Sequence, residues 1–204
     1  SIGWQGGEPT LMGVDFFRRA VEFEKKYGRS QAVVGNGLQT NGVLIDAEFA
    51  KFLAHAHFLT GISVDGPAEI HNKHRLNAAG RGSYADVMRG FANLKRAGAE
   101  FNVLTLVSDA NVGSPDLVYN HQLDNGVLFH QYISCVEHDA DGHLLPFSIT
   151  GPQWGEFMCR IFDLWYPKDT RRVSVRLFDS ILGLLVDGAR NVCHFGRDCR
   201  QYFV

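Results

Sequence analysis

The apolar positions of the chain follow two alternating spacings, which predict helices and strands in turn. Helical spacing, with apolar residues three or four positions apart, follows each of these starting residues: Leu11, Asp46, Ser83, Ser114 and Thr150. Extended apolar runs lie at Gln31–Gln39, Phe58–Val64, Phe101–Val107, Val127–Val136 and Val173–Phe178. Strands that alternate with helices over short links indicate an α/β fold with a parallel sheet, built either as a barrel or as a doubly wound sheet.

Polar residues at the starts of the helical segments match the preferences of N-caps. Thr150 followed by Gln153 resembles a capping box, and Ser114-Pro115 combines a cap with a proline in the first turn. Asp46 and Ser83 are expected to cap their helices in the same way. The segment after Thr150 carries an unbroken apolar stripe, which indicates a packed face rather than a ligand platform: Trp154, Phe157, Met158, Ile161, Phe162 and Trp165.

Glycines cluster beside the apolar runs, at Gly6-Gly7, within Gln39–Gly42 and within Ser63–Gly66. Glycine at a strand end marks a tight turn or a backbone that a ligand approaches closely. In barrels and doubly wound sheets, ligands lie at the carboxyl ends of the parallel strands, where these glycines are expected to fall. We therefore predict that the three loops converge on one rim of the sheet.

Composition and charge narrow the class of protein. Apolar residues make up 45% and charged residues 21% of the 204, which is typical of a globular protein and not of a disordered chain or a disulfide scaffold. Twenty basic and 22 acidic residues give a net charge of -2, so we expect neither nucleic acid nor a membrane as a partner. Four cysteines favour a reducing compartment, hence the cytoplasm.

Several residues on the predicted rim can carry binding chemistry. The backbone at Gly6-Gly7 can lie against a ligand, and the carboxylate of Glu8 can accept hydrogen bonds from an ammonium group; the alternative is a tight turn with a solvated glutamate. Ser63 lies at a strand end. Arg75 can clamp a ligand carboxylate or lie on the surface. The histidines of the polar loop beside it, His71 and His74, are expected to shape that loop through hydrogen bonds.

A series of motifs along the chain resembles the anaerobic sulfatase-maturating enzymes, which are radical S-adenosylmethionine (SAM) proteins of the SPASM subgroup. The motifs are Trp4 to Leu11, Leu38-Gln39-Thr40-Asn41-Gly42, Gly61-Ile62-Ser63-Val64-Asp65-Gly66-Pro67 with Glu69-Ile70-His71-Asn72 and Arg75, and Glu100-Phe101-Asn102. The resemblance extends in register from Ile2 to Val204. It implies a TIM-like partial (β/α) radical SAM barrel that lacks its first strand.

The resemblance also assigns roles to individual residues. Gln5, Gly6, Gly7 and Glu8 would receive the methionine end of SAM, with Glu8 meeting its ammonium group. The ribose-contacting serine corresponds to Ser63, the carboxylate-binding arginine to Arg75, and a residue that packs on the adenine to Val136. Gln39 and Asn41, at the neighbouring strand end, are further candidates. Cys193 and Cys199 would begin the ligand set of an auxiliary 4Fe-4S cluster, the alternative being two free thiols.

By the same resemblance, residues 1–150 would form the partial barrel, 151–190 its closing elements and 191–204 the start of a truncated SPASM extension. Radical SAM chemistry needs three cysteines in a Cys-x3-Cys-x2-Cys loop, and the cysteines of this sequence are spaced differently, at 135, 159, 193 and 199. We therefore expect an internal piece of a longer enzyme, with no catalytic residue within this chain and no activity of its own.

The intact protein would oxidise a cysteine or serine of a sulfatase to Cα-formylglycine, using a 5'-deoxyadenosyl radical derived from SAM. Its expected partners are an unfolded sulfatase polypeptide as substrate and an electron donor such as flavodoxin or ferredoxin. One alternative is another SPASM enzyme that modifies a different peptide. A second is a non-catalytic fragment that binds SAM or a protein partner.

Overall fold

The computed structural model describes residues 1–29, 33–192 and 195–196 and contains one six-stranded sheet. The strands lie side by side in chain order: β1 (Ile2–Trp4), β2 (Asn36–Thr40), β3 (Phe58–Ser63), β4 (Phe101–Val107), β5 (Phe129–Ser134) and β6 (Ser174–Val175). Every neighbouring pair is parallel. The α/β class is therefore confirmed, and the described strands form an open sheet, as in part of a barrel.

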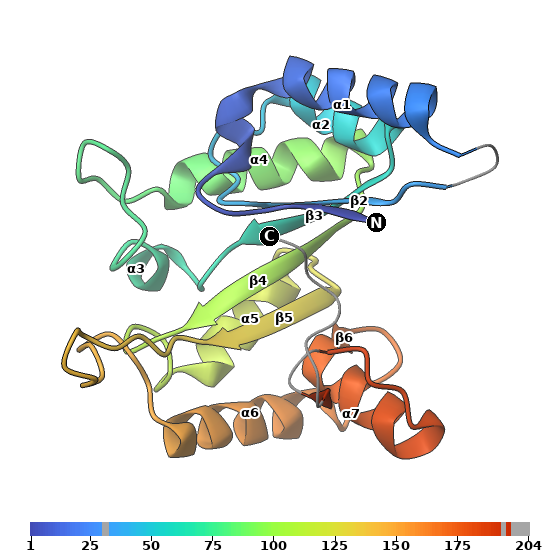
Figure 1. Cartoon of the computed structure of the whole chain (residues 1–204). Helices are drawn as coiled ribbons and strands as arrows, with labels where there is room; N and C mark the ends of the chain where they lie inside the picture. The colour runs from blue at the N-terminus through green and yellow to red at the C-terminus, as the bar shows by residue number, and fades with distance from the viewer. Residues whose placement is uncertain (30–32, 193–194, 197–204) are drawn as a thin grey trace.

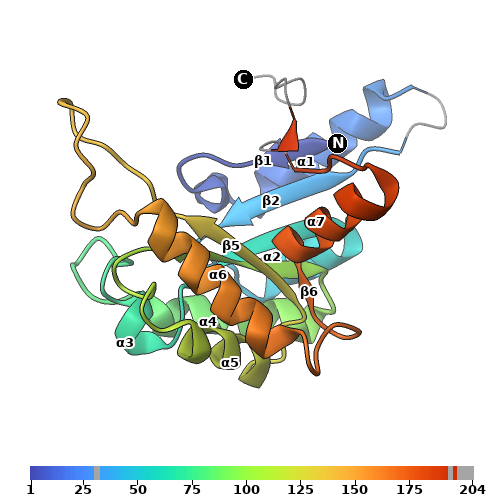
Figure 2. The same cartoon turned by 90° about the horizontal axis from the view of Figure 1, so that it is seen from below.

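The helices that connect the strands cover the outer side of this curved sheet (Figure 1). They are the short 3-10 helix η1 (Pro9–Met12), α1 (Val14–Tyr27), α2 (Ala47–His55), α3 (Ala68–His71), α4 (Tyr84–Ala97), α5 (Pro115–Asp124) and α6 (Gly151–Trp165). Helix α7 (Arg176–Asp187) follows the last strand. Helices α1, α2 and α4 lie together over the first half of the sheet, and α6 lies with α5 over the second half (Figures 1 and 2). No helix in the described ranges has the length and apolar character needed to cross a bilayer.

The core lies between the sheet and these helices, in two clusters. The first joins Phe17 of α1 and Leu94 of α4 to strand residues such as Phe58 and Ile62, all of them fully buried. The second includes Tyr119, Phe157, Met158, Ile161, Trp165 and Val175. Because successive strand residues point to opposite faces, Leu59 and Gly61 lie on the inner face of the sheet, opposite Phe58, Thr60 and Ile62.

Two of the predicted caps form hydrogen bonds, and two do not. Asp46 Oδ1 accepts from the amide of Phe49 at 2.8 Å, and Thr150 with Gln153 makes a complete capping box. Ser83 and Ser114 occupy N-cap positions, but neither side chain caps its helix. The Ser83 hydroxyl instead donates to the backbone carbonyl of Arg75 at 2.9 Å, so a longer-range partner has replaced the local one.

The strand predicted at Val173–Phe178 is mostly wrong. Only Ser174–Val175 is extended, and α7 begins at Arg176. The buried positions explain the change, because the interval between them lengthens from two residues, Val173 to Val175, to three at Phe178. Phe178 then packs on Trp165, with ring centroids 5.1 Å apart, and this contact of α7 with α6 outweighs the strand-like alternation.

The two described cysteines differ in burial. Cys135 is buried at the end of β5, as expected for a small apolar side chain, and this burial raises the pKa of its thiol. Cys159 follows the buried Met158 in α6 but is itself exposed. The reason is its place on α6, where the buried stripe passes through Met158 and Ile161 and leaves Cys159 on the outer face. The predicted metal ligands Cys193 and Cys199 lie outside the described residues.

Candidate functional site

The register of the first three strands brings their carboxyl ends to one edge of the sheet. Trp4 pairs with Leu38, and Leu38 pairs with Thr60, so the residues that follow each strand are neighbours. Gln39 Nε2 donates to Ser63 Oγ at 3.3 Å across the β2–β3 pair. Gly61 makes room for this contact, because a Cβ there would lie 2.0 Å from Gln39 Oε1. The predicted convergence of the loops is confirmed.

Glu8 ties the loop after β1 to the end of β2. Its Oε1 accepts from the amide and the hydroxyl of Thr10, at 3.0 and 2.6 Å, and from the hydroxyl of Thr40 at 2.7 Å. Its Oε2 accepts from the amide of Asn41 at 2.7 Å. A carboxylate offers about four acceptor positions, roughly two on each oxygen. Oε1 is therefore saturated, whereas Oε2 has one hydrogen-bond partner among the described residues and keeps an acceptor position for a ligand.

The two glycines before Glu8 leave the backbone of this loop accessible. Gly6 and Gly7 have φ values of 98° and 55°, in the left-handed region that favours glycine. An added Cβ at either position would meet no heavy atom within 4 Å. The side chain of Gln5 is exposed beside them. A ligand can therefore approach the main chain of this loop directly.

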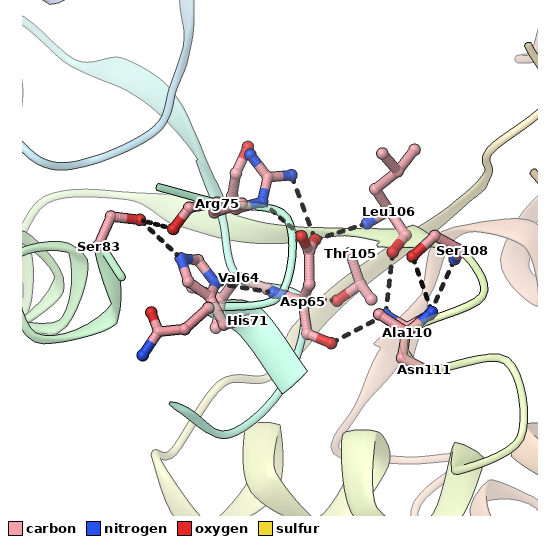
Figure 3. Close-up of polar contacts among 12 residues, drawn as sticks. Val64, Asp65, His71, Arg75, Ser83, Thr105, Leu106, Ser108, Ala110 and Asn111 are labelled. Carbon is pink, nitrogen blue, oxygen red and sulfur yellow. Dashed lines mark hydrogen bonds and ion pairs between the residues drawn. The ribbon is translucent and has the colours of Figure 1, made fainter. Parts of the chain in front are cut away.

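Arg75 is held on the same edge by Asp65, the second residue after β3 (Figure 3). The guanidinium donates through Nε to Asp65 Oδ2 and through Nη2 to Asp65 Oδ1, the latter at 3.2 Å. The Asp65 side chain is 10% exposed and that of Arg75 is 26% exposed, so the pair is only partly screened by solvent. Within the described residues the guanidinium's hydrogen bonds use Nε and Nη2, which leaves Nη1 for a ligand.

His71 is a fully buried member of the same network. The amide of Asp65 donates to His71 Nδ1 at 3.3 Å, so the ring proton lies on Nε2, which is 3.2 Å from Ser83 Oγ. Burial lowers the pKa of His71 to about 4, and the nearby charge of Asp65 opposes this shift. His74 pairs with Asp109 at 2.7 Å. Both histidines shape the loop through hydrogen bonds, as predicted.

The structure brings most of the predicted site residues together. One of them, Val136, lies on the same edge of the sheet but two strands further along. Gln39, Asn41 and Ser63 lie with Glu8 along adjacent strand ends, and Arg75 joins them through Asp65. Val136 follows β5, which β4 separates from β3, and its side chain is 50% exposed. It lies on the same edge because the amide of Cys135, the residue before it, donates to Val107 at the end of β4.

Two asparagines near the rim were assigned no role from the sequence, although Asn102 belongs to one of the motifs. Asn111 is 1% exposed, and its Nδ2 donates to the carbonyls of Asp65 and Leu106, both at 2.9 Å. Asn102 pairs in register with Gly61 on the inner face of the sheet, and its Oδ1 is buried with no hydrogen-bond partner within the described ranges. A polar residue within the apolar run Phe101–Val107 was the available signal for Asn102. Asn111 gave none, because its contact with Asp65 joins residues 46 positions apart in the sequence.

Comparison with known proteins decides the family. The sequence profile of the Radical SAM superfamily matches residues 1–115, more than half of the chain. The chain belongs to the radical SAM superfamily.

Within this superfamily the chain is similar to curated sulfatase-maturating enzymes. It is 36% identical to the cysteine-type anaerobic sulfatase-maturating enzyme of Clostridium novyi, over all of this chain and 55% of that protein. It is 33% identical to the serine-type enzyme of Bacteroides thetaiotaomicron, over 96% of this chain and 51% of that protein. The chain therefore spans about half the length of the curated relatives it matches.

A solved structure shares the fold of this radical SAM chain. Native anSMEcpe with bound AdoMet, which is SAM, and the Cp18Cys peptide superposes with a TM-score of 0.87 at 34% sequence identity. The superposition covers 94% of this chain and 54% of that one. The alignment with the Clostridium novyi enzyme covers the whole chain, so the β1–β3 rim lies within the matched region.

Proposed function

We propose that this chain supplies the SAM-binding rim of an anaerobic sulfatase-maturating enzyme, which oxidises a cysteine or serine of an unfolded sulfatase to Cα-formylglycine in the cytoplasm. The similarity to cysteine-type and serine-type enzymes of this kind supports the assignment. The observation that carries it is the position of Glu8, whose carboxylate joins the loop after β1 to the end of β2 and, within the part of the chain that the structure describes, keeps one free acceptor position.

The donors and acceptors of the rim fit the methionine end of SAM. That end is a zwitterion, so its ammonium needs an acceptor and its carboxylate needs donors when both leave water. Glu8 Oε2 provides the acceptor, and Arg75 Nη1 provides the donor. The open backbone at Gly6 and Gly7 lets the ligand come close, next to Gln5. In this proposal the two ends of the amino acid are bound by two different strand loops.

The remaining candidates extend along the same edge toward the nucleoside. Ser63 would meet the ribose, with Gln39 holding the serine hydroxyl in place and Asn41 beside it. Val136, half exposed at the end of β5, would pack on the adenine. SAM, bound with a 4Fe-4S cluster, supplies the radical that starts the oxidation. The residues of this chain bind and orient it on the edge of the sheet.

The auxiliary iron-sulfur cluster and the electron donor are proposed from the similarity to the relatives. Cys193 and Cys199 would be the first ligands of an auxiliary 4Fe-4S cluster in a SPASM extension that begins near residue 191. An electron donor such as flavodoxin or ferredoxin would reduce the radical SAM cluster, whose cysteine loop is not part of this sequence.

The test uses the full-length protein, isolated anaerobically, with SAM, a reductant and a peptide that contains a Cys/Ser-x-Pro-x-Arg core. We expect 5'-deoxyadenosine together with the mass loss that corresponds to conversion of the cysteine or serine to formylglycine. If 5'-deoxyadenosine forms without that mass loss, the sulfatase assignment is wrong and another peptide is the substrate. If neither product forms, radical SAM activity itself is contradicted.

A further inference from the structure

Asp65 has a hydrogen-bond partner at every one of its polar atoms (Figure 3). Its amide donates to His71 Nδ1, and its carbonyl accepts from Asn111 Nδ2 at 2.9 Å. Its Oδ1 accepts from the amide of Leu106 at 2.9 Å and from Arg75, and its Oδ2 also accepts from Arg75. The residue is 7% exposed. A buried carboxylate with this many fixed donors has one defined orientation.

Arg75 is fixed at its backbone by the same network. Its amide donates to the carbonyl of His71 at 3.1 Å. Its carbonyl accepts from both the amide and the hydroxyl of Ser83, at 3.0 and 2.9 Å. His71 connects the two ends of the network, because it accepts from Asp65 through Nδ1 and faces the Ser83 hydroxyl through Nε2. Asp65 thus fixes the orientation of the Arg75 guanidinium, while His71 and Ser83 hold the Arg75 backbone in place.

A guanidinium has five N–H donors arranged on two edges, so one arginine can serve two carboxylates. Asp65 occupies the edge formed by Nε and Nη2, and the edge that includes Nη1 remains. An unrestrained arginine side chain carries about 2 kcal/mol of rotamer entropy, which a ligand must overcome when it orders the side chain. Asp65 removes this cost before the ligand arrives, because it already holds the guanidinium in one orientation.

We propose that Asp65 is a positioning residue, which orients the Arg75 guanidinium so that its free edge receives the carboxylate of the bound amino-acid ligand. This inference rests on the proposed function, in which that ligand is SAM. It adds a role for a residue that itself touches no ligand atom, and it separates two contributions of the Asp65–Arg75 pair: stability of the loop and affinity for the ligand.

A double-mutant cycle on SAM affinity tests the proposal. The full-length anaerobic protein is prepared as wild type, Asp65→Asn, Arg75→Ala and the double variant, and the Kd for SAM is measured by equilibrium dialysis. Asparagine keeps the shape of Asp65 but turns an amide donor toward a guanidinium donor. We expect Arg75→Ala to weaken binding about 10- to 100-fold, the range for a lost hydrogen bond to a charged group. Asp65→Asn should weaken it about 10-fold in the presence of Arg75 and not at all in its absence.

A matched control separates positioning from stability. Asp169 is also a buried carboxylate paired with an arginine, Arg172, at 2.7 Å, but it accepts a hydrogen bond from Tyr119 of the second core cluster. Asp169→Asn should lower the melting temperature and leave the Kd for SAM unchanged. If it weakens SAM binding as much as Asp65→Asn does, the effect of Asp65→Asn is a general consequence of lost stability, and the proposal is overturned.

The outcomes distinguish this inference from the function on which it rests. If Arg75→Ala leaves SAM affinity unchanged, the assignment of Arg75 to SAM is wrong and the role of Asp65 is overturned with it. If Arg75→Ala weakens binding and Asp65→Asn does not, or if Asp65→Asn weakens it equally in both backgrounds, only the positioning role is overturned.

A second variant keeps the test decisive if Asp65→Asn does not fold. Arg75→Lys retains the positive charge, but its compact ammonium group lacks the planar fork that pairs with both oxygens of Asp65 and presents a second edge to a ligand. If Asp65 positions the guanidinium, Arg75→Lys should bind SAM nearly as weakly as Arg75→Ala. Affinity close to that of the wild type would show that charge alone is sufficient and would contradict the proposal.

Discussion

The backbone amide of Asn41 donates a 2.7 Å hydrogen bond to Oε2 of Glu8, 33 residues earlier in the chain. This contact joins the loop after β1 to the loop after β2, and three further hydrogen bonds to Oε1 of Glu8 reinforce it. One carboxylate therefore both organises the rim and leaves a position open for a ligand. Its loss should affect stability as well as binding.

We expect Glu8→Ala to lower the free energy of unfolding by about 2 to 3 kcal/mol, because it leaves the donors of Thr10, Thr40 and Asn41 without their acceptor. Urea unfolding measures the change. Glu48→Ala is the control, since Glu48 is an exposed carboxylate that pairs with Arg18, and such pairs contribute about 0 to 1 kcal/mol. Equal losses in the two variants would mean that Glu8 does not organise the rim.

Gly90 allows α4 to approach the turn after β2. A Cβ at this position would lie 2.1 Å from the carbonyl oxygen of Gly42, a backbone atom that cannot move away alone. Gly90→Ala should therefore lower the free energy of unfolding by about 1 to 3 kcal/mol, the usual cost of overpacking. This loss should occur although alanine favours a helix over glycine by about 1 kcal/mol.

The control for Gly90 is Gly155 on α6, where an added Cβ meets nothing within 4 Å. Gly155→Ala should raise the free energy of unfolding by about 0.5 to 1 kcal/mol, because only the helix preference of alanine acts there. Chemical denaturation of both variants is the measurement. Stabilisation by Gly90→Ala would contradict the close approach of α4 to Gly42.

Two buried histidines predict a loss of stability in mild acid. Burial lowers the pKa of His71 and of His130 from 6.5 to about 4. Between these values the unfolded chain binds protons that the folded chain does not, so stability falls as the pH drops from 6.5 toward 4 and levels off below that. Each histidine contributes a slope of at most about 1.4 kcal/mol per pH unit.

Denaturant unfolding at intervals between pH 7 and pH 4.5 measures this slope. His71→Gln removes one of these groups and should reduce the slope by up to about 1.4 kcal/mol per pH unit, whatever its effect on stability at pH 7. A slope that is the same in the variant and the wild type would show that His71 does not stay neutral in the folded protein at these pH values.

The fold could be predicted from the sequence where local signals agree with packing. The 3.6-residue stripe of α6 and its Thr150–Gln153 capping box are local, and both are present in the structure. The alternating pattern at Val173–Phe178 predicted a strand, but α7 begins at Arg176, where Phe178 packs on Trp165. The spacing of apolar residues indicates which side chains are buried, but it does not indicate which side chains they pack against.

For the candidate site too, the features that depend on local sequence could be predicted, and those that depend on tertiary contacts could not. Glycines at strand ends were sufficient to predict that Glu8, Asn41 and Ser63 share one rim, because parallel neighbours end at the same edge. The pairing of Asp65 with Arg75 was not predictable, because it depends on a loop that turns back over ten residues. Ser83 illustrates the limit, since it occupies a cap position but its hydroxyl bonds to Arg75.

The most direct test of this account is a crystal structure of the full-length protein with SAM. We expect the ammonium group of SAM to lie within hydrogen-bond distance of Glu8 Oε2 and its carboxylate to be bound by Nη1 of Arg75, with Asp65 still on the opposite edge of the guanidinium. SAM bound away from the β1–β3 rim, or SAM on the rim with Glu8 and Arg75 contacting only protein, would contradict it.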